Sequence, residues 1–367
     1  MTIAIVLPRG SRFDATHPNS VETVVSTINV ASADRDHIVV VTEEGAEVHG
    51  PFATHVIPRS RSKASFARAV KCALRRLNPA LTEFHQTALT FSDVARSFPD
   101  TPSIFYRHNF SKVPTGWARK LWHRRIHRAF DARVFVSDDA RRAFVAGFPS
   151  LAATTVAIPN PVDPTLWYAP VARHTKLIAF AGRAAPEKGF AELCAGLATV
   201  LDRHPDWSVR LYGSEWAVHA DWAREQARAL DRFGDRGRVL PNQPITAVRA
   251  LLQQAEIAVV PSIWAEPFGL AAVEAHMAGA AVVSSGTGGL REASGDHAHY
   301  VDAITPRNLA TAISGLIDDP GGRWALAERG QRFALATHTP ERRAATLDAL
   351  RAQVIAQHKR APWSLTT

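Results

Sequence analysis

The chain contains, at residues 259–274, the stretch Val-Val-Pro-Ser-Ile-Trp-Ala-Glu-Pro-Phe-Gly-Leu-Ala-Ala-Val-Glu. Its apolar beginning predicts a buried strand that ends at Pro261, and the apolar spacing that follows predicts a helix over 268–279. Pro267 would lie in the first turn of that helix, where its missing N–H is no loss. The helix N-terminus would present three unpaired backbone amides, those of Phe268, Gly269 and Leu270. Such amides and the helix dipole favour an anion such as a diphosphate, which can approach closely at a glycine.

Two glutamates flank this turn, Glu266 before the predicted helix and Glu274 within it. Eight helical residues span roughly 12 Å, about the distance from a transferred sugar to a ribose across a diphosphate. Carboxylates accept hydrogen bonds from sugar hydroxyls, so the pair suits a nucleotide-sugar. Two surface glutamates at this spacing also occur by chance, but the surrounding strand, Pro-Phe-Gly and helix favour a functional site.

A second strand-to-helix turn reads Phe-Ala-Gly-Arg-Ala-Ala-Pro-Glu-Lys-Gly at residues 180–189. Arg183 and Lys188 lie where both can hold a phosphate group, the first bidentately and the second as a point charge. Gly182 beside them is a further candidate for nucleotide binding. The pattern is not a Walker loop, and two solvated basic residues are the alternative interpretation. A third turn, Gly-Thr-Gly-Gly-Leu-Arg-Glu at 286–292, either admits a phosphate or only makes a tight turn.

Strand-like runs alternate with helical patterns along the whole chain, which is typical of α/β proteins with parallel sheets. A Pro-rich segment at residues 156–170 divides two such alternations and predicts a linker. We therefore expect an α/β protein with two Rossmann-like, doubly wound domains that face each other across a ligand cleft. The first would span 1–165 and the second 166–340. A C-terminal helix and tail at 341–367 could cross back to the first.

The composition narrows the class of protein. Of the 367 residues, 46% are hydrophobic, and the longest apolar runs fall short of the ~20 residues that a membrane span needs. The apolar residues 3–7 are too few for the core of a signal peptide and predict a first strand. Two cysteines, Cys72 and Cys194, exclude a disulfide framework, so a cytoplasmic location is expected. Both fall in helical patterns and are expected to be packing residues.

The net charge of +9 is unevenly distributed along the chain. Residues 1–170 hold 21 basic and 14 acidic residues, whereas residues 171–367 hold 22 and 20. The stretch 107–128 carries seven basic residues, no acidic one, and Trp117 and Trp122. Such a helix suits an anionic membrane, or it packs with its basic residues on the outer face. The charge also suits nucleic acid, but no recognised binding motif supports that partner and we predict none.

No metal site is predicted from the sequence. His123 and His127 have the spacing of zinc ligands, but Arg124 and Arg125 between them would repel a cation. The only Asp-x-Asp, at residues 34–36, precedes a predicted strand far in sequence from the phosphate-binding turns, and we interpret it as a solvated turn.

Taken together, these segments resemble the C-terminal domain of the family 4 glycosyltransferases, which are retaining enzymes of the GT-B fold. The motifs Gly-Arg…Glu-Lys-Gly and Glu-x(7)-Glu of that family are matched by Arg183, Lys188, Glu266 and Glu274. Its Gly-Gly-x-x-Glu turn is matched by Gly288, Gly289 and Glu292. The resemblance covers nearly the whole chain and is specific in residues 176–302.

The resemblance implies a role for each matched side chain. Arg183 and Lys188 would neutralise the donor diphosphate. Glu266 would hold hydroxyls of the transferred sugar, and Glu274 those of the ribose. His108 matches the histidine whose ring approaches the donor sugar in this family, and a structural histidine is the alternative.

One loop departs from the family pattern. The family has Gly-Gly-x-Glu after the first strand, where the loop lines the acceptor site. In this chain Asn19 and Ser20 replace the glycines, while Glu22 aligns with the glutamate. Gly10, in the same loop, is a candidate for nucleotide binding.

We therefore predict a retaining, metal-independent hexosyltransferase that needs no cofactor. It would move a sugar from a UDP-sugar, or a GDP-sugar, to a hydroxyl of a glycan, lipopolysaccharide or lipid-linked acceptor in polysaccharide biosynthesis. It would act in the cytoplasm, with peripheral contact to the inner face of the membrane. Two alternatives are a sugar-nucleotide epimerase of GT-B fold and a non-catalytic saccharide- or lipid-binding protein.

Overall fold

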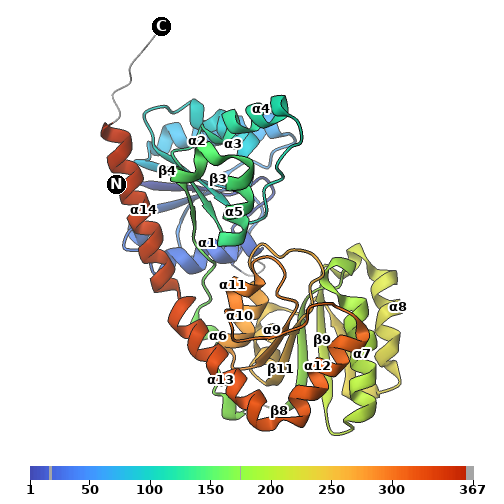
Figure 1. The fold of residues 1–367 in the computed structure, drawn as a ribbon. Coiled ribbons are helices and arrows are strands. Elements are labelled where there is room, and N and C mark those ends of the chain that lie inside the picture. Colours follow the sequence, from blue (N-terminus) through green and yellow to red (C-terminus); the bar gives the residue numbers. More distant parts are fainter. Residues whose placement is uncertain (16–18, 174, 361–367) are drawn as a thin grey trace. The chain divides into compact units, whose positions relative to one another are not determined.

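The computed structural model describes residues 1–15, 19–173 and 175–360, and the chain divides into two compact units (Figure 1). Unit 1 comprises Met1–Pro161 and Pro340–Thr367, and unit 2 comprises Val162–Thr339. Each unit is a parallel sheet with helices packed against it, as the alternating pattern predicts. The first boundary lies a few residues before the expected position at 165.

Unit 1 contains a seven-stranded sheet with the order β3-β2-β1-β4-β5-β6-β7, in which every pair is parallel. Its strands are β1 (Ile3–Val6), β2 (Ile38–Glu43), β3 (Ala53–Ile57), β4 (Leu81–His85), β5 (Ser103–Arg107), β6 (Ala132–Phe135) and β7 (Thr155–Ala157). Its α-helices are α1 (Ser20–Val30), α2 (Lys63–Leu77), α3 (Ala88–Arg96), α4 (Trp117–His127), α5 (Asp138–Gly147) and α14 (Pro340–Arg360). Every residue of β1, β4 and β6 is buried, as expected of central strands in a sheet covered on both faces.

Unit 2 contains a six-stranded parallel sheet with the order β10-β9-β8-β11-β12-β13. Its strands are β8 (Thr175–Arg183), β9 (Ser208–Ser214), β10 (Gly237–Pro241), β11 (Ala255–Val260), β12 (Ala281–Ser284) and β13 (His299–Tyr300). Its α-helices are α6 (Pro164–Trp167), α7 (Phe190–Arg203), α8 (Ala220–Asp231), α9 (Ile245–Leu252), α10 (Leu270–Met277), α11 (Leu290–Ser294), α12 (Pro306–Asp318) and α13 (Pro320–Thr337). The order reverses at β8, which lies between β9 and β11, and ligands of such sheets bind beyond the strand ends at this reversal.

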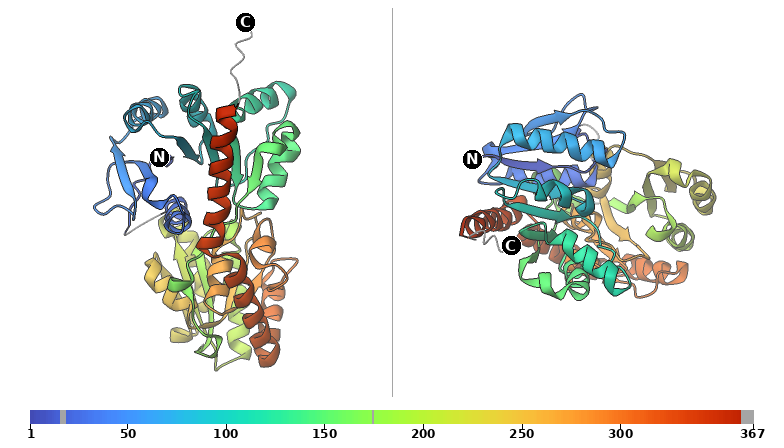
Figure 2. Two further views of the ribbon diagram at one scale, coloured as in Figure 1. Left: turned by 90° about the vertical axis from the view of Figure 1, so that its left-hand side faces the viewer. Right: turned by 90° about the horizontal axis from the view of Figure 1, so that it is seen from above.

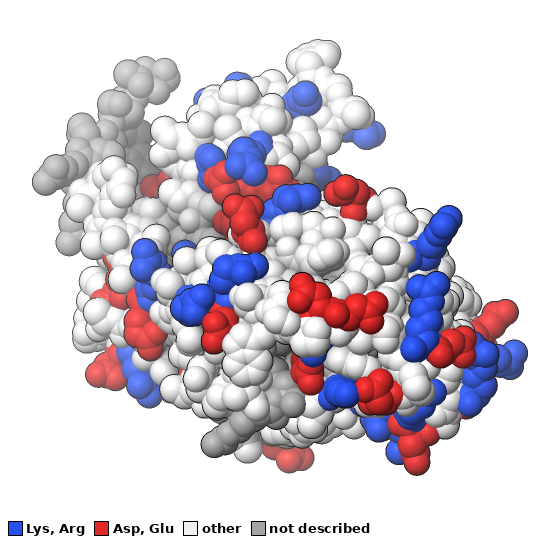
Figure 3. All heavy atoms as spheres, turned by 60° about the horizontal axis from the view of Figure 1, so that its bottom comes forward, with Lys and Arg blue, Asp and Glu red and all other residues white. Residues whose placement is uncertain are grey.

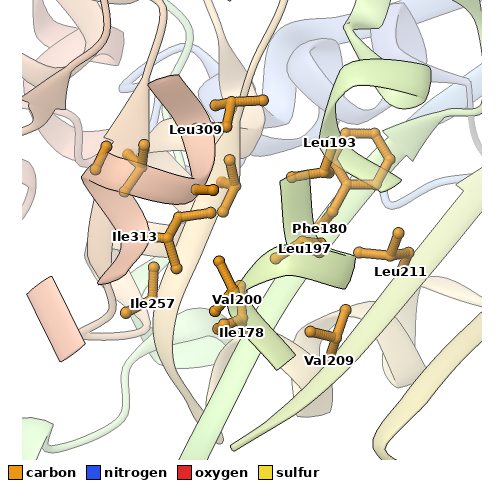
Figure 4. Packing of buried hydrophobic residues seen from close by; sticks show 14 of the residues in the cluster. Ile178, Phe180, Leu193, Leu197, Val200, Val209, Leu211, Ile257, Leu309 and Ile313 are labelled. Carbon is orange, nitrogen blue, oxygen red and sulfur yellow. The ribbon is translucent and has the colours of Figure 1, made fainter. Parts of the chain in front are cut away.

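The core of unit 2 holds β8 and its neighbours in place. Helix α7 packs beside α12, and apolar side chains of both helices meet those of the strands (Figure 4). The residues labelled there are Ile178, Phe180, Leu193, Leu197, Val200, Val209, Leu211, Ile257, Leu309 and Ile313, and all of them are buried. Each such side chain contributes about 1.5–3 kcal/mol when it leaves water, so the strand ends that carry the loops are firmly supported.

Helix α14 is remote in sequence from the rest of unit 1 but packs against its α1 and β5 (Figures 1 and 2). Arg351 of this helix is fully buried, and its Nε and Nη2 donate to the two carboxylate oxygens of Glu83 on β4, at 2.6 and 3.1 Å. Its Nη1 donates to Asp348 and Ser32, and Nη2 also donates to Asn29. This bidentate, fully hydrogen-bonded ion pair attaches α14 to the sheet.

Of three expectations about local structure, one holds in part, one was wrong and one is confirmed. The segment 156–170 contains the boundary between the two units, after Pro161, as predicted, but it begins within β7, which pairs with β6, and it contains α6. Cys72 is exposed and not a packing residue, since α2 buries Phe66, Val70, Ala73 and Leu74 on its other face. Cys194 is buried as expected.

Candidate active site

Three loops of unit 2, which follow β8, β11 and β12, are joined by backbone hydrogen bonds. The N–H groups of Ile263 and Trp264 donate to the carbonyl oxygen of Glu187, at 2.9 and 3.3 Å. The N–H of Gly289 donates to the carbonyl oxygen of Glu266 at 2.8 Å. The structure therefore brings the three turns predicted from the sequence together at the strand reversal of this sheet.

Two glycines allow this close approach. Gly189 has φ of 67°, and a Cβ there would lie 2.1 Å from the carbonyl oxygen of Pro261. Gly288 has φ of 58°, and a Cβ there would lie 2.4 Å from the carbonyl oxygen of Glu266. Residues 286–292 were expected either to admit a phosphate or to make a tight turn. For Gly288 the tight turn is the explanation, because the space beside its Cα is filled by the backbone of Glu266.

Glu266 and Lys188 form the centre of this arrangement. Glu266 is only 7% exposed, and its Oε1 accepts hydrogen bonds from Nζ of Lys188 and from the hydroxyl of Ser262, both at 2.5 Å. Nζ of Lys188 also lies 5.3 Å from the ring centroid of Trp264, within range of a cation–π interaction. Among the described residues no donor is assigned to Oε2 of Glu266, so this oxygen can accept a hydrogen bond from a ligand.

Arg183, at the end of β8, is also paired with carboxylates. Its guanidinium lies 2.9 Å from Glu187 and 3.9 Å from Glu215, and all three side chains are partly exposed. A backbone hydrogen bond and the charge of Arg183 lower the pKa of the Glu187 carboxyl, against an opposing effect of burial. Both cations of the site are thus balanced by carboxylates in the structure, so an incoming diphosphate would exchange with these partners.

The helix expected over 268–279 is shorter, because α10 begins at Leu270 after Gly269, whose φ is 113°. Pro267 consequently lies outside the helix and not in its first turn. The estimate of roughly 12 Å between the two glutamates assumed a helix over the whole segment, whereas only its part from Leu270 onward is helical. Among the described residues no acceptor is assigned to the backbone N–H groups of Phe268, Gly269 and Leu270.

Glu274 lies on α10 in largely buried surroundings. Burial raises the pKa of its carboxyl to about 7, and the positive charge of Arg249 acts in the opposite direction. Part of the population therefore carries a proton near neutral pH. Hydroxyl groups such as those of a ribose would bind most strongly to the ionised form, which accepts hydrogen bonds at both oxygens.

We expect the free energy of unfolding to depend on pH because of Glu274. Its folded-state pKa lies above the value of 4.5 for a free side chain, so the folded state binds the proton more tightly. The free energy of unfolding should therefore fall by up to about 3 kcal/mol as the pH rises from 4.5 to 7. Glu274→Gln should remove this fall, so urea unfolding should show the variant more stable than wild type at pH 8 and little different at pH 4.5. An equal difference at both pH values would contradict the assignment.

The other predicted site residues lie in unit 1. His108 directly follows β5, and its Nε2 lies 2.8 Å from Nδ1 of His85, the last residue of β4. Gly10 has φ of 90°, and its N–H donates to the carboxylate of Glu43 at 2.6 Å. Glu22 is buried and its carboxylate accepts the N–H groups of Arg12, Phe13 and Asn19, so it shapes this loop. Residues 16–18 of the same loop lie outside the described residues.

Sequence reasoning missed several neighbours of these residues. Ser262, Trp264, Glu187 and Glu215 contact the predicted cations or Glu266, and His85 contacts His108. Ser262, Trp264 and Glu187 lie within the quoted motifs. The contact of Trp264 with Lys188 joins two loops, whereas Ser262 contacts Glu266, and Glu187 contacts Arg183, within one loop. The sequence does contain a signal for His85. This residue ends one strand, and His108 follows the next strand along the chain.

His123 and His127, which have the spacing of zinc ligands, do not lie in a metal site among the described residues. His127 is buried among Phe105, Phe144 and Phe148, and burial lowers its pKa to about 3. Throughout the part of the chain that the structure describes, no three histidine, cysteine, aspartate or glutamate side chains gather as a metal site requires. Asp36 of the Asp-x-Asp sequence lies in an exposed 3-10 turn at Arg35–His37.

Two sequence models of protein families match the chain. The model described as glycosyl transferases group 1 matches residues 170–333, and that described as glycosyltransferase family 4 matches residues 21–166. Among curated proteins, the chain is 35% identical to D-inositol 3-phosphate glycosyltransferase of Corynebacterium glutamicum over 42% of this chain and 38% of that one. It is 32% identical to glycogen synthase of Mycobacterium tuberculosis over 71% of this chain and 64% of that one. The chain thus matches between about a third and two thirds of the length of these relatives.

Solved structures show the same fold. Sucrose-phosphate synthase from Thermosynechococcus elongatus superimposes with a TM-score of 0.76 at 19% identity, over 97% of this chain and 100% of that one. Anabaena Alr3699/HepE in complex with UDP gives 0.74 at 19% identity and the same coverage. The two sheets and their strand orders therefore define a protein of the GT-B fold. By its matches to both sequence models, the chain belongs to the family 4 glycosyltransferases.

Proposed function

We propose that the chain is a retaining glycosyltransferase that takes its sugar from a nucleotide diphosphate donor, with UDP favoured. The observation that carries the proposal is the group of Arg183, Lys188 and Glu266 on loops joined at the strand reversal of unit 2. It combines two cations, for a diphosphate, with a carboxylate oxygen available to sugar hydroxyls. The HepE structures named for UDP and UDP-glucose support uridine as the nucleoside of the donor.

In the proposed reaction the bond between the anomeric carbon and the diphosphate oxygen breaks while an acceptor hydroxyl attacks on the same face. The proton of that hydroxyl passes to the departing diphosphate, which serves as the base. Negative charge grows on the diphosphate as the bond breaks, so Arg183, Lys188 and the amides before α10 bind the transition state more strongly than the donor. Glu266 would orient the sugar, and Glu274 would bind the ribose.

A thermal-shift screen with UDP-, GDP- and ADP-sugars tests the donor. We expect the melting temperature to rise most with a UDP-sugar, and we expect UDP to be released slowly by hydrolysis when no acceptor is present. An epimerase would instead convert the donor into its epimer without releasing UDP. A binding protein would show the thermal shift with neither product, so the three functions give different results.

Metal independence is a separate expectation. The positive groups of the site are side chains and backbone amides, and they can stabilise the diphosphate without a divalent ion. Activity should therefore persist in excess chelator. Loss of activity that Mg²⁺ or Mn²⁺ restores would contradict this part of the proposal.

The acceptor proposed here is a glycan or a lipid-linked molecule, and the surface of α4 favours the second. Trp117 is 81% exposed, Leu121 and Trp122 are also exposed, and basic residues alternate with them on this helix. An open hollow is lined by Pro114, Ala118, Arg119, Trp122 and His123. Exposed tryptophans among basic residues suit the headgroup region of an anionic membrane. Within the described residues, no helix combines the length and apolarity that crossing a membrane requires.

We expect the chain to bind anionic liposomes and to lose that binding as salt is raised, since screening shortens to about 3 Å at 1 M. Charge reversal of Arg124 and Arg125 on α4 should weaken binding further. A matched control reverses Arg224 and Arg228 on α8, because this helix carries acidic as well as basic residues. Basic and acidic side chains are likewise interspersed over the face of the molecule drawn in Figure 3. Equal binding to neutral and anionic liposomes would contradict membrane contact through α4.

A further inference from the structure

Two histidines meet at the carboxyl edge of the sheet in unit 1. His85 ends β4 and His108 follows β5, and the neighbouring strands pair His85 in register with Tyr106. Nδ1 of His85 lies 2.8 Å from Nε2 of His108, which is a hydrogen bond between two imidazoles. Both rings stack on Tyr106, with centroid distances of 5.1 and 4.8 Å, and this stacking fixes the orientation of the pair.

Neither imidazole is charged near neutral pH. Burial, with a smaller contribution from Arg351 on α14, lowers the pKa of His85 to about 3. Burial, then His85 and Arg107, lowers the pKa of His108 well below its usual value. Two neutral rings that face each other through one nitrogen each share a single proton in that contact, so one ring donates and the other accepts.

The remaining nitrogen of His85 decides which ring donates. Its Nε2 is buried and has no hydrogen-bond partner among the described residues. A buried N–H without an acceptor is costlier than an unpaired lone pair, and the nearby positive charge of Arg351 also favours a lone pair there. The proton of His85 therefore lies on Nδ1, which donates to Nε2 of His108.

The charged groups around the pair do not alter this assignment. Glu83, on the same strand as His85, is held by the guanidinium of Arg351. Arg107 donates to the backbone carbonyl oxygens of Gln86 and Phe110. A neutral His108 whose Nε2 accepts from His85 must carry its own proton on Nδ1.

We propose that His85 is a positioning residue that holds His108 in the neutral Nδ1–H tautomer, so that His108 meets its ligand as a hydrogen-bond donor and not as a base. The identity of that ligand as the donor sugar rests on the proposed function, whereas the tautomer does not. An acceptor on the sugar, such as a hydroxyl oxygen, is the chemistry that this tautomer recognises.

Nitrogen-15 NMR of the histidine rings tests the tautomer without any substrate, with the His108 signals identified by their loss in His108→Asn. We expect Nδ1 of His108 to be protonated and Nε2 unprotonated from pH 6 to 8. His85→Asp presents only an acceptor and should move the proton of His108 to Nε2, whereas His85→Asn retains an N–H donor and should leave it in place. Protonated Nε2 in the wild type, or an unchanged tautomer in His85→Asp, would overturn the proposal.

Kinetics give the second readout. His85→Asp should lower kcat by about ten- to a hundredfold, as expected for a misplaced hydrogen-bonding group, with little change in KM for the donor. His85→Asn should keep most of the activity, and His55→Leu on the edge strand β3 should keep all of it. Should no sugar donor be turned over by the wild type while the NMR result stands, the proposed function fails and the positioning role remains. Equal kcat for His85→Asp and wild type would instead overturn the role in catalysis.

Discussion

Lys188→Ala is expected to lower kcat by about 10²–10³-fold, because one cation that stabilises a leaving group in a closed site is worth about 3–4 kcal/mol. In the structure Lys188 is the partner of Glu266, so the variant removes both a phosphate ligand and the cation that holds this carboxylate. Arg183→Ala should cause a fall of similar size. Glu274→Ala should mainly raise KM, since ribose contacts exist in both the ground and transition states.

Steady-state kinetics on purified, folded variants measures these effects. Lys176→Ala is the matched control, because Lys176 lies on the same strand as Arg183 but pairs with Asp206 at the surface. Its kcat and KM should equal those of wild type. Wild-type kcat in both Lys188→Ala and Arg183→Ala would show that the leaving group binds elsewhere.

Arg351→Met is expected to destabilise the protein by about 3–5 kcal/mol, the cost of leaving a buried charge without its partner. Arg351 is fully buried and forms an ion pair with Glu83, so its loss leaves that carboxylate buried under α14 without this partner. The free energy of unfolding in urea should fall accordingly. Combining Arg351→Met with Glu83→Gln should recover much of the loss, since the fully buried carboxylate is then also replaced by a neutral group.

The control for this variant is Arg332→Met on α13. Arg332 forms an ion pair with Glu328 at 3.5 Å, but both side chains are exposed, and such pairs contribute only about 0–1 kcal/mol. If the Arg351 and Arg332 variants lost the same stability, the buried pair would not be what attaches α14 to unit 1.

The histidine pair shows where sequence reasoning ended. His108 was found through its resemblance to a family motif, which names one residue at a time. Its partner His85 lies 23 residues earlier, and only parallel pairing of β4 with β5 makes them neighbours. The protonation of the pair depends on burial and on Arg351 from the far end of the chain, and neither has a local signal.

In the site of unit 2, too, some features were predicted from the sequence and others were not. Arg183, Lys188 and Glu266 were predicted because they lie at strand-to-helix turns, where cations and free backbone amides suit a phosphate group, and because they match a family motif. The ion pair between Lys188 and Glu266 was not predicted, because it joins two loops 78 residues apart. Glycines at 189 and 288 are visible in the sequence, but only the packed loops show that each faces a carbonyl oxygen.

The sequence by itself determined the two parallel α/β units, the turns that carry the candidate residues and the family, because these follow from local periodicity and short motifs. The tertiary structure decided where α10 begins, since the backbone at Gly269 adopts a φ of 113° against Leu290 and Ala293 of α11. It also decided that Cys72 faces solvent and that Arg351 is buried. These features depend on which surfaces meet after folding, and a pattern within one segment carries no information about the surface that covers it.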